Sequence, residues 1–232
     1  MDVRSKQELK ELVTGWLLAP VCSRQIVTLN ALILMRAWQD ARMRRIVQRA
    51  DLVTVDGVGV ELALRKKGYE KIQRFTGLEL TLEMLSRLRG KNCSVYLYGG
   101  APRVVALLKQ MIPRRFPDVS LCAVRDGYSQ QMPPIQVMGE IVAKQPGLLL
   151  VALGSPKQEI FLDEVLPRLK GTVGVGVGGA FEVLAGIKRE APQFVRDLGV
   201  EWLFRMLQDP LRVKKIPDLV KFGYYMLKLR QD

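Results

Sequence analysis

The sequence predicts an α/β fold: a Rossmann-like, mostly parallel sheet with helices on both faces, followed by a helical C-terminal appendage. Short, almost wholly apolar runs alternate with stretches whose apolar residues recur at helical spacing. Strands that are apolar throughout are typical of parallel sheets covered on both faces. After about residue 190 the apolar runs stop, and Pro192, Pro210 and Pro217 separate short helical pieces.

Six apolar runs are predicted to be strands, and they are Ile26–Leu29, Leu52–Val55, Cys93–Tyr98, Val119–Val124, Leu148–Leu153 and Val173–Val177. Helical spacing is found at residues 32–35, about 58–67, 104–112 and 137–142. We therefore divide the chain into an α/β core at residues 1–195 and a basic helical appendage at residues 196–232.

The loops that follow the predicted strands are rich in glycine and polar residues. They are Thr28-Leu29-Asn30, Asp56-Gly57, Tyr98-Gly99-Gly100, Gly154–Glu159 and Gly178-Gly179. Open α/β sheets bind ligands outside the carboxyl ends of their strands. The sequence therefore predicts an enzyme site in these loops, chiefly at residues 56–59 and 154–159.

Cysteine usage and hydropathy indicate a cytoplasmic protein. The three cysteines of the 232 residues form no CxxC pair, which favours reduced thiols and argues against a zinc site. The first residues are too polar for a signal peptide, and no run of ~18 apolar residues could span a membrane. Since apolar residues make up 48% of the chain, a sizeable core is expected.

The chain contains no histidine. This excludes Ser-His-Asp and Cys-His catalysis and every histidine-ligated metal. A general base must then be a carboxylate, or else a lysine, tyrosine or cysteine.

The net charge of +13 favours contact with nucleotides, nucleic acid or anionic lipid, although a solvated basic surface explains it equally well. The basic residues lack a recognisable nucleic-acid-binding motif or an aromatic stacking platform. We therefore expect no nucleic-acid partner.

The segment Gly154-Ser155-Pro156-Lys157-Gln158-Glu159 has two interpretations. Ser155 as N-cap, Pro156 at the first helical position and Gln158 at the third would form a capping box. Alternatively, the helix N-terminus holds an anion or a sugar, with Lys157 and Gln158 supplying donors. Gln158 can hardly fill both roles at once.

Asp56 also has two interpretations. Aspartate is a good N-cap, and Asp56 precedes a predicted helix. As a carboxylate at the edge of the sheet, it could instead accept a proton from a substrate hydroxyl.

Residues 174–179 contain the pattern GxGxxG. By itself this match is a weak indication of a nicotinamide cofactor. Because Gly174 and Gly176 lie within a predicted strand, we expect them to allow close packing against a neighbour or a ligand. A NAD(P)-dependent Rossmann-type oxidoreductase remains the alternative class.

No Asp-x-Asp pair is present to hold a divalent ion. The charge of a diphosphate would then fall to arginine, lysine and backbone N–H groups. Arg74, Arg205 and Arg212 are candidates.

The ordered set of motifs resembles the WecG/TagA/CpsF family of bacterial glycosyltransferases. The matching elements are Thr28-Leu29-Asn30, Asp56–Gly59, Arg74 with Gly77, Leu97–Gly100, Asp126-Gly127-Tyr128, Val151–Glu159, Gly176–Phe181, Ala191-Pro192, Glu201–Arg205 and Asp209–Arg212. The resemblance implies an inverting, metal-independent transferase without a cofactor. It would move an N-acetylmannosamine-type sugar from UDP to N-acetylglucosamine on undecaprenyl diphosphate, a step in building a cell-surface polysaccharide or teichoic acid.

The resemblance also implies roles for single residues. Asp56 matches the family's proposed base, and Thr28, Asn30 and Gln158 would line the sugar or acceptor site. Arg205 and Arg212 would approach the nucleotide diphosphate. Further substrate contacts are expected from the loop residues Gly57, Arg74, Gly99, Gly154, Lys157 and Gly178. The C-terminal segment would fold over the site and place the enzyme on the inner face of the cell membrane, and a homo-oligomer is possible.

The chain departs from the family pattern at three places. Arg125-Asp126 stands where the family often has His-His, and Glu190 stands where arginine is usual before Ala-Pro. Glu79 replaces a common aspartate. These departures do not change the interpretation as a transferase, but they leave the identity of the donor sugar undecided.

Overall fold

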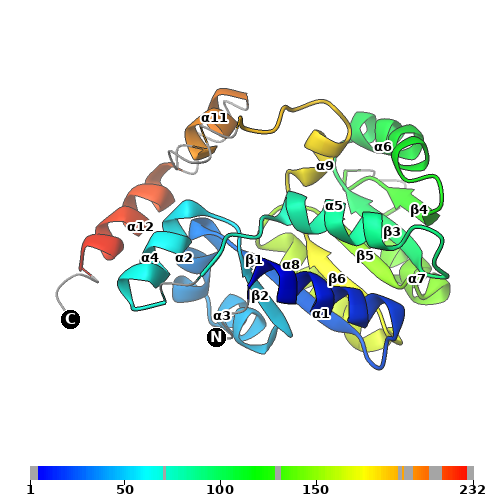
Figure 1. Cartoon of the computed structure of the whole chain (residues 1–232), viewed down its shortest axis with the longest axis horizontal. Coiled ribbons are helices and arrows are strands. Elements are labelled where there is room, and N and C mark those ends of the chain that lie inside the picture. The colour runs from blue at the N-terminus through cyan, green and yellow to red at the C-terminus, as the bar shows by residue number, and fades with distance from the viewer. Residues whose placement is uncertain are drawn as a thin grey trace.

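The computed structural model describes residues 5–69, 72–128, 132–192, 195, 201–208 and 216–228. Its centre is a six-stranded sheet in the order β2-β1-β6-β5-β3-β4 (Figure 1). Every strand pair is parallel. The predicted α/β fold with a parallel sheet is therefore confirmed.

The six strands lie where the apolar runs predict them. They are β1 (Arg24–Leu29), β2 (Leu52–Val55), β3 (Ser94–Gly99), β4 (Ser120–Arg125), β5 (Leu148–Ala152) and β6 (Val173–Gly176). The central strands are apolar because both of their faces are covered, and Leu148 to Val151 are each fully buried.

Helices cover both faces of this sheet. They are α1 (Lys6–Leu18), α2 (Ala31–Gln39), α3 (Ala41–Arg49), α4 (Val58–Lys66), α5 (Gly77–Arg87), α6 (Pro102–Arg115), α7 (Pro134–Lys144), α8 (Lys157–Val165) with the short 3₁₀ helix η1 (Leu166–Arg168), and α9 (Ala180–Leu184). Helices α1, α5, α6 and α9 enclose one core, and α7 and α8 enclose a second on the opposite face. A third core lies between β1, β2, α2 and α3.

Strand β6 approaches helix α8 through its glycines. A Cβ on Gly174 would lie 2.8 Å from a methyl carbon of Leu162, and a Cβ on Gly176 would lie 2.7 Å from Nε2 of Gln158. The GxGxxG pattern therefore serves close packing of a strand against a helix, as expected. Beyond α9, no strand is found in the part of the chain that the structure describes.

Two helices are described in the C-terminal segment, α11 (Glu201–Gln208) and α12 (Ile216–Lys228). In Figure 1, α12 lies beside α2 and α4 at one end of the molecule. Its Phe222 and Met226 are buried against Met35 of α2 and Ala63 of α4. The predicted helical appendage is thus confirmed as helical where it is described, and one face of α12 packs on the core. No described helix is long and apolar enough to cross a bilayer.

Candidate active site

The carboxyl ends of β1 and β6 are tied together by Thr28. Its hydroxyl donates a 3.0 Å hydrogen bond to the backbone oxygen of Gly176 in the adjacent strand. Asn30 follows β1 and caps α2, because its Oδ1 accepts from the N–H groups of Leu32 and Ile33 at 3.1 Å each. Both predicted residues therefore lie at the sheet edge, where a ligand of this fold would bind.

Asp56 lies directly after β2 and is held at two points. Its backbone N–H donates to the oxygen of Leu29 at 2.9 Å, and its Oδ1 accepts from the N–H of Gly77 at 3.1 Å. Gly77 is the first residue of α5, so a carboxylate oxygen lies at the positive end of that helix. The N-cap interpretation of Asp56 is wrong, since Gly57 is the N-cap of α4 and no side chain caps that helix.

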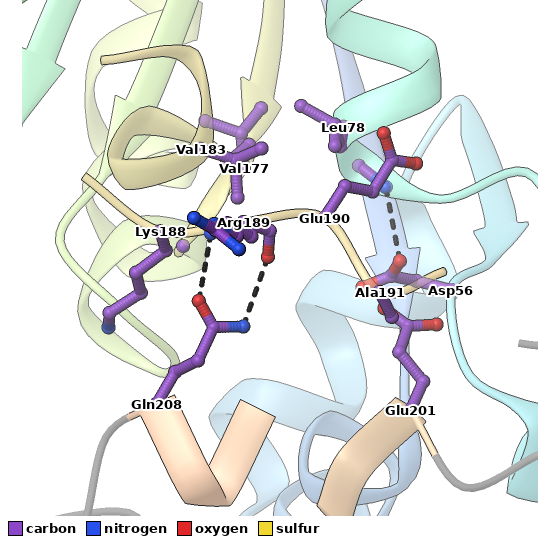
Figure 2. A pocket seen from close by; sticks show the side chains of 13 residues that line it. Asp56, Leu78, Val177, Val183, Lys188, Arg189, Glu190, Ala191, Glu201 and Gln208 are labelled. Atoms are coloured by element: carbon purple, nitrogen blue, oxygen red, sulfur yellow. Dashed lines mark hydrogen bonds between the residues drawn. The ribbon is translucent and has the colours of Figure 1, made fainter. Parts of the chain in front are cut away.

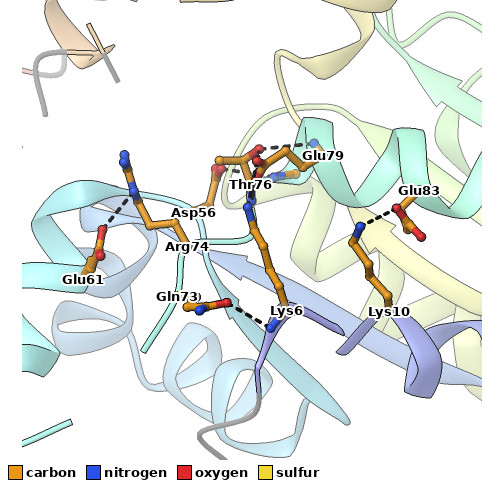
Figure 3. Close-up of polar contacts among 10 residues, drawn as sticks. Lys6, Lys10, Asp56, Glu61, Gln73, Arg74, Thr76, Glu79 and Glu83 are labelled. Atoms are coloured by element: carbon orange, nitrogen blue, oxygen red, sulfur yellow. Dashed lines mark hydrogen bonds and ion pairs between the residues drawn. The ribbon is translucent and has the colours of Figure 1, made fainter. Parts of the chain in front are cut away.

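The start of α5 is fixed by Thr76 and Glu79, which form a capping box (Figure 3). Lys6 of α1 pairs with Glu79, with Nζ 2.9 Å from Oε1. Burial raises the pKa of Glu79, but the hydrogen bonds from Thr76 and Lys6 outweigh it and hold that pKa below its ordinary value. Glu79, one of the departures from the family pattern, therefore orders the helix whose first N–H binds Asp56.

The loop after β5 is joined to the loop after β6 by Gln158. Its Oε1 accepts from the N–H of Gly154 at 3.2 Å and from the N–H of Gly178 at 3.1 Å. Its Nε2 donates to Oε1 of Glu159 at 2.9 Å. Of the two interpretations of this segment, the capping box is wrong, because Pro156 occupies the N-cap position of α8 and no side chain caps it. Gln158 is instead drawn inward as a buried bridge between two loops.

Two polar groups beneath this bridge are buried without a hydrogen bond. They are the Ser155 hydroxyl and the Oε2 atom of Glu159. Burial dominates and raises the pKa of Glu159, which favours its neutral form.

The predicted loop glycines lie at the same edge of the sheet. Gly99 has φ +117°, and a Cβ there would lie 2.4 Å from the backbone oxygen of Ala152. Gly154 and Gly178 also have positive φ, at +76° and +47°. Gly57 lies against Asn30, since a Cβ on it would be 3.5 Å from the Asn30 Cβ. The contact of Gly99 brings the end of β3 close to the end of β5, and the contact of Gly57 brings the loop after β2 close to the loop after β1.

The predicted basic residues have different surroundings. Arg74 pairs with Glu61 of α4, with Nε 2.9 Å from Oε2 (Figure 3). Lys157 is exposed at the first position of α8. Arg205 belongs to α11, but its side chain is outside the described part, and Arg212 lies wholly outside the described residues. Their approach to a diphosphate remains a prediction.

Asp56 and Glu201 line two cavities. The smaller, of about 40 Å³, also contains Lys188, Arg189, Glu190 and Gln208. Figure 2 shows two hydrogen bonds between Gln208 of α11 and the backbone of Arg189. The N–H of Arg189 donates to Oε1 of Gln208 at 2.8 Å, and Nε2 of Gln208 donates to the backbone oxygen of Arg189 at 3.0 Å. The larger cavity, of about 570 Å³, lies between α2, α4 and α12 and is mostly apolar. The carboxylate of Asp56 thus lies between a small recess with mixed polar and apolar walls and a larger, mostly apolar cavity.

Comparison with known proteins agrees with this arrangement. The model of the "Glycosyl transferase WecG/TagA/CpsF family" matches residues 1–232. The chain belongs to this family. A similar curated protein is the N-acetylglucosaminyldiphosphoundecaprenol N-acetyl-beta-D-mannosaminyltransferase of Bacillus spizizenii, which is 32% identical over 203 residues. The alignment covers 88% of this chain and 78% of that protein. The protein is therefore a glycosyltransferase, which sets the oxidoreductase alternative aside.

Within this glycosyltransferase, Arg125, which departs from the family pattern, pairs with a carboxylate. Its guanidinium binds Glu140 of α7 through two hydrogen bonds of 2.8 and 3.0 Å, and the Tyr96 hydroxyl donates to the same carboxylate at 2.9 Å. The hydrogen bond from Arg125 lowers the pKa of Glu140. The departure at residue 125 is thus absorbed by a structural ion pair.

Sequence reasoning missed several contacts of the glycosyltransferase site. The amide of Gly77, which binds Asp56, is 21 residues away along the chain. Glu61 and Gln208 belong to no sequence motif. Glu201 belongs to a segment that matches the family, but nothing in the sequence gives it a role of its own. Among the described residues, no group of three or more histidine, cysteine, aspartate or glutamate side chains is placed to hold a metal ion.

Proposed function

We propose that this glycosyltransferase moves an N-acetylmannosamine-type sugar from a UDP-sugar to N-acetylglucosamine linked to undecaprenyl diphosphate. The reaction is a direct displacement at the anomeric carbon with inversion, without a metal, in the assembly of a cell-surface polymer. The name of the similar Bacillus protein supports this donor sugar and this acceptor. The position of Asp56 in the lining of two neighbouring cavities supports the mechanism.

In this mechanism Asp56 removes the proton from the acceptor hydroxyl as that oxygen attacks the anomeric carbon. With no histidine in the chain, a carboxylate is the natural base. The hydrogen bond from Gly77 holds Oδ1 in place, so the carboxylate is oriented before substrate binds. Arg205 and Arg212 would stabilise the negative charge that develops on the departing UDP.

The remaining predicted contacts surround this centre. Thr28 lies on β1, the strand next to β2, and Asn30 follows β1 as Asp56 follows β2. Gln158 joins the loops that carry Gly154 and Gly178. The backbone of those loops, with Gly57 and Gly99, would contact the donor. Lys157, Arg74 and the arginines of the C-terminal segment would supply positive charge. The enzyme would work at the inner face of the membrane, with residues 196–232 as the contacting part.

A transfer assay tests the proposal. Purified enzyme is mixed with UDP-N-acetylmannosamine and an N-acetylglucosaminyl diphosphate lipid, with and without EDTA, and UDP release and the anomeric configuration of the product are measured. A β-linked disaccharide formed equally well in EDTA is expected. Loss of turnover in EDTA that Mg²⁺ restores would contradict the metal-independent mechanism. A thermal-shift comparison of UDP with NAD should show stabilisation by UDP alone.

A further inference from the structure

The large cavity beside Asp56 has an apolar wall on three sides. Ala31 and Leu32 come from α2, Val58 and Gly59 from α4, and Ile216, Leu219, Val220 and Phe222 from α12. Its volume of about 570 Å³ is in the range of pockets that bury a small organic ligand. An apolar recess of this size at a sheet edge is more than polar sugars require.

Few polar residues line this cavity in the part of the chain that the structure describes. They are Asn30, Asp56, Arg74 and Glu201. Among the described side chains that line it, only Arg74 is basic, and its Nε also pairs with Glu61. These walls fit a ligand with an extended apolar part, for which Arg74 would face an anionic group and Asp56 the reacting hydroxyl.

The chemistry of the reaction assigns this side to the acceptor. A base must contact the hydroxyl that it deprotonates, and in a displacement with inversion the leaving group departs on the opposite side of the anomeric carbon. The recess on the other side of Asp56, of about 40 Å³, is lined by Lys188 and Arg189 together with Glu190, Glu201 and several apolar side chains. It is too small to bury a lipid chain, so the larger apolar cavity is the side of Asp56 that fits the lipid of the acceptor.

Helix α12 is seated closely enough to act as a wall of this cavity. Phe222 and Met226 are buried against α2 and α4. A Cβ on Gly59 would lie 2.7 Å from Cε1 of Phe222, so α12 lies directly against the first turn of α4, which begins two residues after Asp56. The half-buried Leu219, one turn before Phe222, faces the cavity.

We propose that the cavity between α2, α4 and α12 binds the first isoprenoid units of the acceptor's lipid chain, next to its diphosphate. This assignment rests on the proposed function for the identity of the acceptor. It adds to that function a binding site for the lipid chain on the protein itself, separate from the membrane.

Water-soluble prenyl diphosphates test the assignment without a membrane. Binding of dimethylallyl, geranyl and farnesyl diphosphate is measured by calorimetry on the full chain, with inorganic diphosphate as the reference. Each unit that enters the cavity buries apolar surface, so the affinity should rise by about fivefold or more from dimethylallyl to geranyl diphosphate. Equal affinity for all of the chain lengths would overturn the proposal.

Substitutions in opposite walls locate the effect. Leu219→Gln and Leu32→Gln should each reduce the gain per isoprenoid unit to about twofold or less, because a polar amide replaces an apolar wall. Leu219→Met is the matched control and should keep the wild-type gain, since the wall remains apolar. Undiminished gains in both glutamine variants would also overturn the proposal. The proposal would also be overturned by two results together: no prenyl diphosphate binds, and the protein forms a dimer that Leu219→Gln dissociates. A second copy of the chain would then occupy the cavity.

Transfer assays separate this assignment from the proposed function. With N-acetylglucosaminyl diphosphates bearing the same chains, KM should fall with chain length while kcat stays similar. If no acceptor is used but geranyl diphosphate still binds more tightly than dimethylallyl diphosphate, the proposed reaction is wrong and the lipid site stands.

Discussion

The carboxylate of Asp56 accepts a 3.1 Å hydrogen bond from the backbone N–H of Gly77, the first residue of helix α5. The bond links the end of β2 to a helix that is itself anchored by Thr76, Glu79 and Lys6. Because this hydrogen bond uses Oδ1, the other carboxylate oxygen can be replaced by an amide nitrogen without losing the bond.

Asp56→Asn should therefore keep the position of the side chain and lose most of the transferase activity. The asparagine Oδ1 can still accept from Gly77, so the unfolding midpoint should stay near that of the wild type. Removing a general base should lower kcat by about 10²–10⁴-fold, while donor binding is unchanged. Steady-state kinetics and calorimetry with UDP measure both quantities. Turnover like that of the wild type would remove Asp56 from the role of base.

Gln158→Leu should destabilise the fold and not only the site. The substitution removes three hydrogen bonds and leaves the N–H groups of Gly154 and Gly178 without their acceptor. The free energy of unfolding should fall by about 2–4 kcal/mol, as measured by urea denaturation. Gln136→Leu, in an exposed position of α7, is the control and should change it by less than about 0.5 kcal/mol. Equal effects of the two substitutions would contradict the bridging role.

Glu159 should give the protein a pH dependence with a definite sign. Burial raises its pKa in the folded state above the ordinary value of 4.5. The folded protein then binds more protons than the unfolded chain, so this group's contribution to stability is complete below pH 4.5 and is lost as pH rises through the folded-state pKa. Glu159→Gln removes the titration. The stability of the variant relative to the wild type should therefore increase from pH 4.5 upward, as measured by urea denaturation across pH. A constant difference would show that Glu159 does not titrate abnormally.

Gly59→Ala should loosen α12. A Cβ there would meet the Phe222 ring at 2.7 Å, and Phe222 is buried, so the helix must shift. Overpacking of this kind costs about 1–3 kcal/mol, and α12 should become more sensitive to limited proteolysis. Gly139→Ala in α7 is the matched control, because nothing lies within 4 Å of a Cβ at that position. It should stabilise by about 0.5–1 kcal/mol and leave α12 protected.

The exposed face of the C-terminal helices should bind anionic lipid. Leu207 is 77% exposed and Tyr224 is 55% exposed, and basic residues are frequent in this segment. Removing residues 197–232 should abolish liposome binding, but it would also expose Met35 and Ala63, which α12 covers. The paired change Leu207→Ser and Tyr224→Ser is therefore the cleaner test, and should weaken sedimentation with anionic vesicles several-fold. Ile135→Ser, 67% exposed in α7, should leave it unchanged.

The sheet could be predicted from the sequence because each strand is a buried, apolar segment. The predicted run 148–153 and the observed β5, Leu148–Ala152, differ by one residue. The helix expected at about 58–67 is observed at Val58–Lys66. Both depend on local hydrophobicity, which the sequence displays directly.

The site was predictable in its location and not in its contacts. The capping interpretations of Asp56 and Ser155 follow local rules, but Asp56 bonds to Gly77 and Gln158 bonds to Gly178, far away in sequence. Nothing local shows that Gln158 turns inward, since that depends on β6 having no side chain at Gly176. Likewise, the docking of α12 on α2 depends on tertiary packing alone.

The contact between Gly59 and Phe222 joins two parts of the chain that would otherwise be free to change separately. A larger residue at position 59 fits only if position 222 becomes smaller or α12 moves away from α4. In related chains these two positions should therefore change together. A C-terminal segment exchanged between relatives should work best when the residue after Asp56-Gly57-Val58 is exchanged with it.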